Sequence, residues 1–117
     1  MSLTVFLEKI KNTTAVSFDE SMAAITENYH YQPTEFSNGL HEYKLTNLAG
    51  TNEGSCRIFA FAKLHGFNPQ QTLNLFGEFY RRDVLNNPEG SDHQNIRLFM
   101  RYGWEGVVFN GVALTPR

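Results

Sequence analysis

The run from residue 87 to residue 97 holds the side chains of this chain that are best suited to chemistry. Polar groups crowd beside an apolar helix face here, which is typical of a site. Its histidine could act as an acid, a base or a ligand near neutral pH, and a nearby carboxylate could orient the ring. We therefore predict a binding groove at this place, near the junction of the fourth and fifth predicted helices. The predicted binding residues are Asp83, Glu89, Asp92, His93, Asn95 and Arg97.

Much of the same run also has a structural explanation, which stays open beside the functional one. Residues 87–90 (NPEG) suit a type I turn, with proline at the second position and glycine at the fourth. Asp83 could reach His93 or Arg97 across this turn. In this alternative the polar groups form a hydrogen-bonded cluster that clamps the fourth helix to the fifth.

The single cysteine, Cys56, suggests a different kind of chemistry. We expect it in or just after the first turn of a helix and beside Arg57, and both features lower the pKa of a thiol. An alternative function is therefore a small cysteine hydrolase with Cys56 as the nucleophile and His93 as the base. A small buried residue in a packed helix is the structural explanation of the same cysteine. The candidates for the orienting group are Asp83, Asp92 and Asn95.

The sequence lacks the common motifs for metals and nucleotides. His30, His41 and His65 share no metal-ligand spacing, and neither HExxH nor a paired CxxC occurs. A P-loop and a GxGxxG motif are also missing from the sequence. We therefore expect neither a metal site nor a cofactor.

Composition predicts one folded domain over residues 1–117. Hydrophobic residues make up 41% and aromatic residues 14%, which is enough for one aromatic-rich core. The formal net charge is −2 and the basic residues are scattered, so nucleic acid is not an expected partner. No apolar run approaches the roughly 18–20 residues of a spanning helix, so membrane insertion is not expected. One cysteine excludes an internal disulfide and fits a reducing compartment.

Apolar periodicity predicts two helices at the start of the chain. Apolar residues recur at i, i+3, i+4 and i+7 from Leu3 to Ile10, which is one face of a helix. Charged residues interrupt this stretch too early for a signal peptide. The second helix follows Ser17, which has the capping-box spacing to Glu20. We expect Pro33 to end this second helix.

The third predicted helix forms the centre of the fold. It starts near Asn52, whose side chain is the expected cap, and covers approximately residues 53–65. Residues 58–62 (IFAFA) are apolar on every side, which is typical of a helix buried all round. We therefore predict an α+β domain that is mainly α, with about five helices around this one.

Two further helices and two turn signals complete the prediction. The fourth helix opens at Asn68-Pro69 and continues through Gly77, which should mark the close approach of a neighbour. The fifth begins at Ser91, in a capping box with Gln94, and ends at Gly103. Segment 34–48 forms either two short strands around Asn38-Gly39 or an ordered loop. Residues 107–114 are predicted to form a C-terminal type I′ hairpin around Asn110-Gly111.

Four segments together resemble the HopJ type III effector family. They are residues 54–62 (GSCRIFAFA), 79–85 (FYRRDVL), 87–97 and 103–106 (GWEG), and the resemblance runs from about residue 3 to residue 114. The family is named for a plant-pathogen protein delivered through a type III secretion system. The resemblance implies no particular enzymatic activity, cofactor or catalytic residue set.

These observations together favour a non-enzymatic, effector-like or virulence-associated binding protein from a bacterium. Its partner is expected to be a protein or a small molecule. The alternatives are the cysteine hydrolase and a structural or regulatory protein, the latter as a homodimer through exposed aromatic residues. The expected location is the bacterial cytoplasm, with export through a type III system as the alternative.

Overall fold

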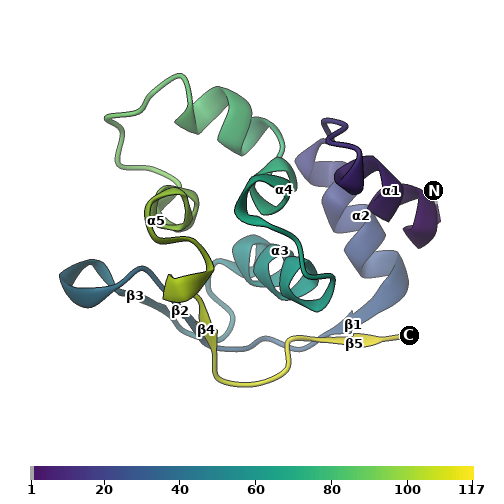
Figure 1. The fold of residues 1–117 in the computed structure, drawn as a ribbon. Helices are drawn as coiled ribbons and strands as arrows, with labels where there is room; N and C mark the ends of the chain where they lie inside the picture. The colour runs from purple at the N-terminus through teal and green to yellow at the C-terminus, as the bar shows by residue number, and fades with distance from the viewer. Residues whose placement is uncertain (1) are drawn as a thin grey trace.

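Helix α3 (Glu53–Leu64) lies at the centre of the fold, as its apolar sequence predicts. The computed structural model describes residues 2–117, and in it Ile58, Phe59 and Phe61 are completely buried. Helices α1 (Leu3–Lys11) and α2 (Phe18–Asn28) lie on one side of α3, and α5 (Gln94–Tyr102) lies on the other (Figure 1). The predicted class, α+β and mainly α, is confirmed.

The first two helices form as the sequence predicts. Phe6 and Ile10 on α1 are buried against the core. At the start of α2, Ser17 accepts from the backbone N–H of Glu20, and the Glu20 side chain accepts from Ser17 N–H, so the capping box is complete. Helix α2 ends at Asn28, before Pro33, because the chain turns there into a strand. None of the helices within residues 2–117 is both long and apolar enough to cross a membrane.

The strands form two small antiparallel sheets. One pairs β1 (Tyr29–Tyr31) with β5 (Leu114–Pro116), and the other has the order β3-β2-β4. In the second sheet β2 (Phe36–Asn38) pairs with both β3 (Leu45–Asn47) and β4 (Val108–Phe109). Segment 34–48 therefore forms two strands, joined through the short 3-10 helix η1 (His41–Tyr43).

The predicted C-terminal hairpin is wrong, although both of its strands exist. Strand β4 pairs with β2, with Phe36 opposite Phe109, and β5 pairs with β1, with Tyr31 opposite Leu114. The two strands thus belong to different sheets. The turn predicted at Asn110-Gly111 rests on local sequence alone. The hairpin does not form, because β4 and β5 pair instead with the strands within residues 29–38.

The fourth predicted helix is broken at Gly77. Helix α4 (Pro69–Asn74) has Asn68 as its cap and Pro69 as its first residue, as predicted, but a separate π-helix, η2 (Phe79–Val84), follows it. Gly77 has φ +61°, and a Cβ at this position would clash with the backbone nitrogen of Phe18. The predicted close approach is therefore confirmed, while the predicted continuity of the helix through this glycine is wrong.

Helices α3 and α5 begin in the same unusual way. The residue before each helix, Asn52 and His93, has a left-handed backbone with φ of 50° and 49°, and no side chain caps either start. The predicted Asn52 cap and the predicted start of α5 at Ser91 are both wrong, because the left-handed turn places the first helical residue after His93. Gln94 instead donates to the Ser91 carbonyl oxygen. Gly103 ends α5 as predicted.

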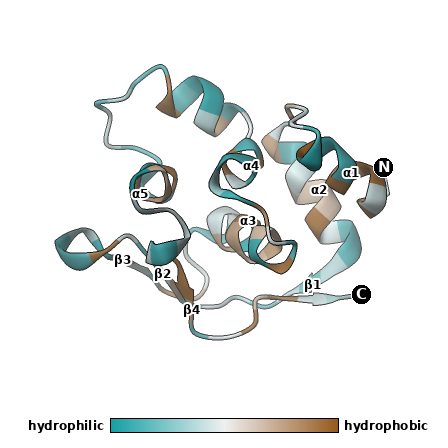
Figure 2. Cartoon of the chain, in the orientation of Figure 1, coloured by the Kyte–Doolittle hydropathy of each residue, from teal (hydrophilic) through white to brown (hydrophobic). Residues whose placement is uncertain are grey.

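A short 3-10 helix, η3 (Gly103–Gly106), leads from α5 into β4. The loop between η2 and α5 is hydrophilic, in contrast to the hydrophobic residues of α3 and β4 (Figure 2). Trp104 of η3 donates its indole N–H to the Phe67 carbonyl oxygen at 2.9 Å, and its ring packs against Phe99. The end of α5 is thereby fixed against the core, which leaves the start of the helix and the preceding loop as its polar end.

Candidate functional site

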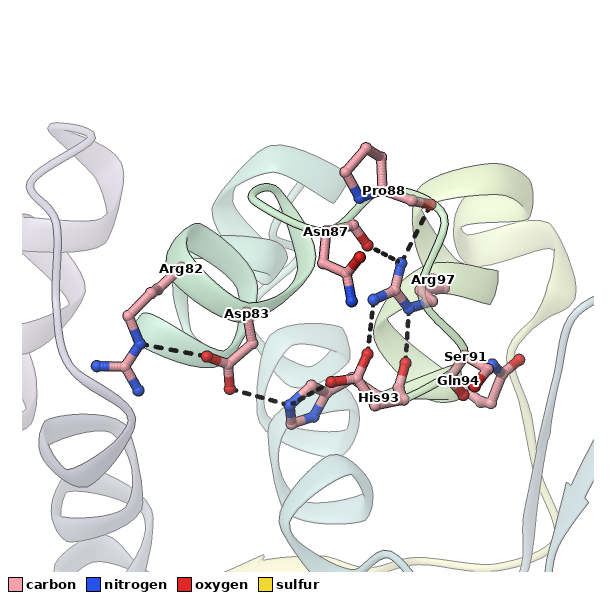
Figure 3. A network of polar contacts seen from close by, with 9 residues as sticks. Arg82, Asp83, Asn87, Pro88, Ser91, His93, Gln94 and Arg97 are labelled. Carbon is pink, nitrogen blue, oxygen red and sulfur yellow. Dashed lines mark hydrogen bonds and ion pairs between the residues drawn. The ribbon is translucent and has the colours of Figure 1, made fainter.

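The side chains of His93 and Asp83 are in hydrogen-bond contact between the start of α5 and the end of η2 (Figure 3). His93 Nε2 lies 3.1 Å from Asp83 Oδ2, and Arg82 donates to the other oxygen of the same carboxylate. The His93 ring also packs on Phe79, with 5.2 Å between ring centroids and 33° between planes. The side chains of His93 and Asp83 are each 29% exposed. The predicted reach of Asp83 toward His93 is therefore confirmed, and this contact fixes the direction of the imidazole.

Arg97 organises the loop that precedes α5 rather than an open binding surface. Its guanidinium donates to the carbonyl oxygens of Asn87, Pro88 and Asp92 and to the Asp92 carboxylate (Figure 3). The Arg97 hydrogen bond holds the pKa of Asp92 below its usual value. The predicted turn is confirmed, because Gly90 N–H donates to the Asn87 carbonyl oxygen. The structural explanation therefore accounts for Arg97 and Asp92.

Glu89 lies at the tip of this loop and is exposed to solvent. Its side chain takes part in none of the hydrogen bonds or ion pairs found within residues 2–117. The structure thus does not bring Glu89 together with the other predicted binding residues.

A buried network of asparagine side chains connects the two uncapped helix starts. Asn95, which is 5% exposed, donates to Asn47 Oδ1 at 2.9 Å and accepts from Asn47 Nδ2 at 3.2 Å. Asn38 donates to the backbone and side-chain oxygens of Asn95, and Asn52 donates to Asn47 Oδ1 at 2.7 Å. The residue before α3 is therefore linked through β3 to the first turn of α5.

An open cavity of about 540 Å³ lies where these helix starts meet, which we call the α3–α5 cavity. Its volume is within the range of about 300–1,000 Å³ that is usual for small-molecule sites. Apolar and polar side chains from five parts of the chain form its wall, namely the starts of α2, α3 and α5, strand β3 and segment 76–79. The lining residues are Phe18, Leu45, Asn52, Gly54, Ser55, Phe76, Phe79, His93, Gln94, Asn95 and Ile96.

Among residues 2–117, no aspartate, glutamate, lysine or arginine lines the α3–α5 cavity. The first N–H groups of a helix have no partner inside the helix and carry a partial positive charge. Because neither α3 nor α5 has a side-chain cap, backbone N–H groups at Gly54, Ser55 and Gln94 are available as donors. The cavity therefore combines aromatic surface with hydrogen-bond donors.

Cys56 does not have the properties of a nucleophile. Its side chain is 1% exposed, and its thiol donates to the Thr34 carbonyl oxygen at 3.5 Å. Burial raises the pKa of the Cys56 thiol, so the prediction of a lowered pKa is wrong. The neighbouring Tyr31, also affected mainly by burial, has its pKa raised to about 12. Within residues 2–117 the thiol forms no hydrogen bond to a histidine.

Of the predicted site residues, His93 and Asn95 line the cavity. Asp83 does not line it but contacts the His93 ring. Within the described part of the chain, no group of three or more histidine, cysteine, aspartate or glutamate residues could hold a metal ion. Sequence reasoning missed the contributions of the α2 and α3 starts to the cavity. The missed lining residues that carry rings or polar groups are Phe18, Asn52, Ser55, Phe76, Phe79 and Gln94.

The chain is similar to one solved structure over its whole length. This is a crystal structure of an unknown function protein, VPA0580, with 45% sequence identity and a TM-score of 0.94; the match covers 100% of this chain and 95% of that one. A search of curated proteins finds no match. The family model described as HopJ type III effector protein matches residues 3–114. The chain therefore belongs to the HopJ type III effector protein family.

Proposed function

We propose that this protein is a non-enzymatic binding module that takes up a small ligand in the α3–α5 cavity. The observation that carries the proposal is the convergence of two uncapped helix starts and several aromatic rings on one cavity of about 540 Å³. A buried asparagine network holds these helix starts together. Such a prearranged set of donors lowers the cost of ordering the site when a ligand binds.

The surroundings of the two candidate nucleophiles, Ser55 and Cys56, support binding without turnover. Among the residues that the structure describes, Ser55 provides the only hydroxyl of the cavity wall, and no hydrogen bond links it to His93. A serine needs such a base to become nucleophilic. The thiol of Cys56 is buried with a raised pKa. The arrangement thus supplies donors and apolar surface but no activated nucleophile.

We propose that the folded protein acts in the bacterial cytoplasm. Its α1 segment, Leu3–Lys11, is folded into the core through Phe6 and Ile10. A reporter fused to the C-terminus of the chain should stay in the cells of a strain with a working type III system. Its appearance in the medium, and not in a secretion-deficient strain, would contradict this location.

The binding proposal can be tested by amide NMR spectra of isotope-labelled protein with a library of small organic fragments. At least one fragment should give saturable shifts of amides that line the α3–α5 cavity, and mass spectrometry should recover it unchanged. Ser55→Trp fills the cavity and should weaken this binding by about tenfold or more. Ser91→Trp, in the exposed loop, is the matched control and should leave it unchanged. Chemical conversion of the fragment, or equal binding by Ser55→Trp, would contradict the proposal.

A further inference from the structure

Three partly exposed rings form a row along one wall of the α3–α5 cavity. Phe18 meets Phe79 edge to face, with 4.8 Å between centroids, and Phe79 lies 5.2 Å from the His93 ring at an angle of 33°. All three rings line the cavity and none is fully buried. Gly54 allows the row to lie against α3, because a Cβ there would come within 2.9 Å of the Phe18 ring. Rows of this kind accept flat rings by stacking or edge contacts.

Polar groups beside the ring row offer donors and acceptors at close range. Asn52 donates one side-chain N–H to Asn47 and Gln94 donates one to the Ser91 carbonyl oxygen, and within residues 2–117 the amide oxygens of Asn52 and Gln94 accept no hydrogen bond. The Ser55 hydroxyl and the backbone N–H groups at the helix starts are donors. A wall that offers both donors and acceptors can match the edge of a heteroaromatic ring that carries nitrogen and carbonyl or amino groups.

Among the described residues, the wall has no lysine, arginine, aspartate or glutamate to neutralise an ionic ligand, and its positive potential comes only from the partial charges of the two helix starts. Phosphate groups are usually held by arginine or lysine, and cations by carboxylates, yet none of these residues lines the cavity. His93, the one titratable side chain that the described part of the chain places in the wall, already contacts Asp83. An uncharged ligand therefore fits this wall better than an ionic one.

We propose that the α3–α5 cavity binds an uncharged planar heteroaromatic compound of the size of a free nucleobase. The inference rests on the proposed binding function and adds the chemical class of the ligand. The ring would lie along Phe18, Phe79 and His93, and its polar edge would face the starts of α3 and α5. Ser55 and Gln94 would then form hydrogen bonds with that edge.

Amide NMR titrations with three probes test separately the flat ring, the polar edge and the lack of charge that we propose for the ligand. Adenine has a flat ring and a polar edge, indole has a flat ring without ring acceptors, and adenosine 5′-monophosphate adds a charged group. Adenine should shift the amides of Gly54, Ser55 and Gln94 and should bind at least about fivefold tighter than indole. The monophosphate should bind no tighter than adenine. Equal binding of indole, or clearly tighter binding of the monophosphate, would overturn the assignment of class.

Two ring substitutions provide the matched control. Phe79→Leu removes a ring from the row, and Phe109→Leu removes a partly buried ring on β4 outside the cavity. Once thermal unfolding shows both to be folded, Phe79→Leu should weaken adenine binding by about fivefold or more and Phe109→Leu by less than about twofold. An equal loss of adenine affinity in both variants would contradict a role of the ring row in binding. If library fragments occupy the cavity but adenine does not, the class is wrong and the binding function stands; if no fragment enters, the binding function itself fails.

Discussion

Asn47 and Asn95 exchange two hydrogen bonds through their side-chain amides, at 2.9 and 3.2 Å, in the interior of the protein. One residue belongs to β3 and the other to the first turn of α5, 48 positions further along the chain. Asn52, directly before α3, joins the same pair. The geometry of the α3–α5 cavity therefore depends on an asparagine network in which Asn52 and Asn95 line the cavity and the buried Asn47 joins them.

Replacement of Asn95 by alanine should destabilise the protein by about 2 kcal/mol, because buried amide groups of Asn47 and Asn38 lose partners. The free energy of unfolding in urea measures this effect. Asn86→Ala, an exposed asparagine just beyond η2, should change it by less than about 0.5 kcal/mol. If Asn95→Ala lowers the free energy of unfolding by no more than Asn86→Ala does, the asparagine network does not hold the helix starts.

Gly77 and Gly66 form a matched pair for the packing of α2 against the chain after α4. Both have positive φ, +61° and +64°, so alanine is strained at either position. A Cβ at Gly66 meets nothing within 4 Å, whereas at Gly77 it would clash with the backbone of Ser17 and Phe18. Gly66→Ala should cost about 1 kcal/mol from backbone strain alone, and Gly77→Ala about 3 kcal/mol or more. Equal losses in urea unfolding would contradict the close approach.

How far the fold could be predicted depends on the distance over which each signal acts. The capping box of α2, the proline at the start of α4 and the apolar interior of α3 are local patterns, and all three are confirmed. The C-terminal hairpin failed because β4 and β5 pair with strands about 70 to 85 residues earlier in the chain.

The candidate site could be predicted only in part, for the same physical reason. His93 and Asn95 stood out because their types and neighbours are unusual in sequence. Phe18, Ser55 and Phe79 reach the same cavity from separate elements, and no local pattern indicates that they meet. The left-handed backbone at His93 replaced the expected capping box, because tertiary contacts to Asp83 and Phe79 fix that residue.

Acid should weaken the fold through His65, which joins the end of α3 to Tyr29. Burial, and to a smaller degree Lys11, lowers the pKa of His65 in the folded protein. Between this pKa and the unfolded value of about 6.5, the unfolded chain binds more protons, so the free energy of unfolding falls as pH falls through this window. A charged His65 can only donate from Nε2 to the Tyr29 hydroxyl, 2.7 Å away, whereas the neutral ring can also accept there.

Urea unfolding from about pH 8 to about pH 5.5 measures this effect above the main carboxylate titrations. The wild-type protein should lose stability toward the acid end, and His65→Gln should lose less, because the substituted side chain does not titrate. Asp92, whose pKa is lowered by Arg97, contributes only at more acidic pH. The same pH dependence in both proteins would show that His65 is not the responsible group.

Iodoacetamide should distinguish the binding module from the cysteine hydrolase. Because Cys56 is buried and its pKa is raised, the native protein should be alkylated more slowly than a free thiol near pH 7. Denaturant should restore the rate of a free thiol, which serves as the internal control. If Cys56 in the native protein is alkylated faster than a free thiol, the result would support Cys56 as a nucleophile and contradict the binding module.

The most direct test of the account is the set of intermolecular nuclear Overhauser effects between a bound fragment and the side chains of the protein. We expect contacts from the fragment to the rings of Phe18, Phe79 and His93, in the α3–α5 cavity. A second groove, lined by Phe109, Val112 and Leu114 among others, provides the comparison in the same sample. Contacts to these three side chains, with none to the ring row, would contradict the central claim.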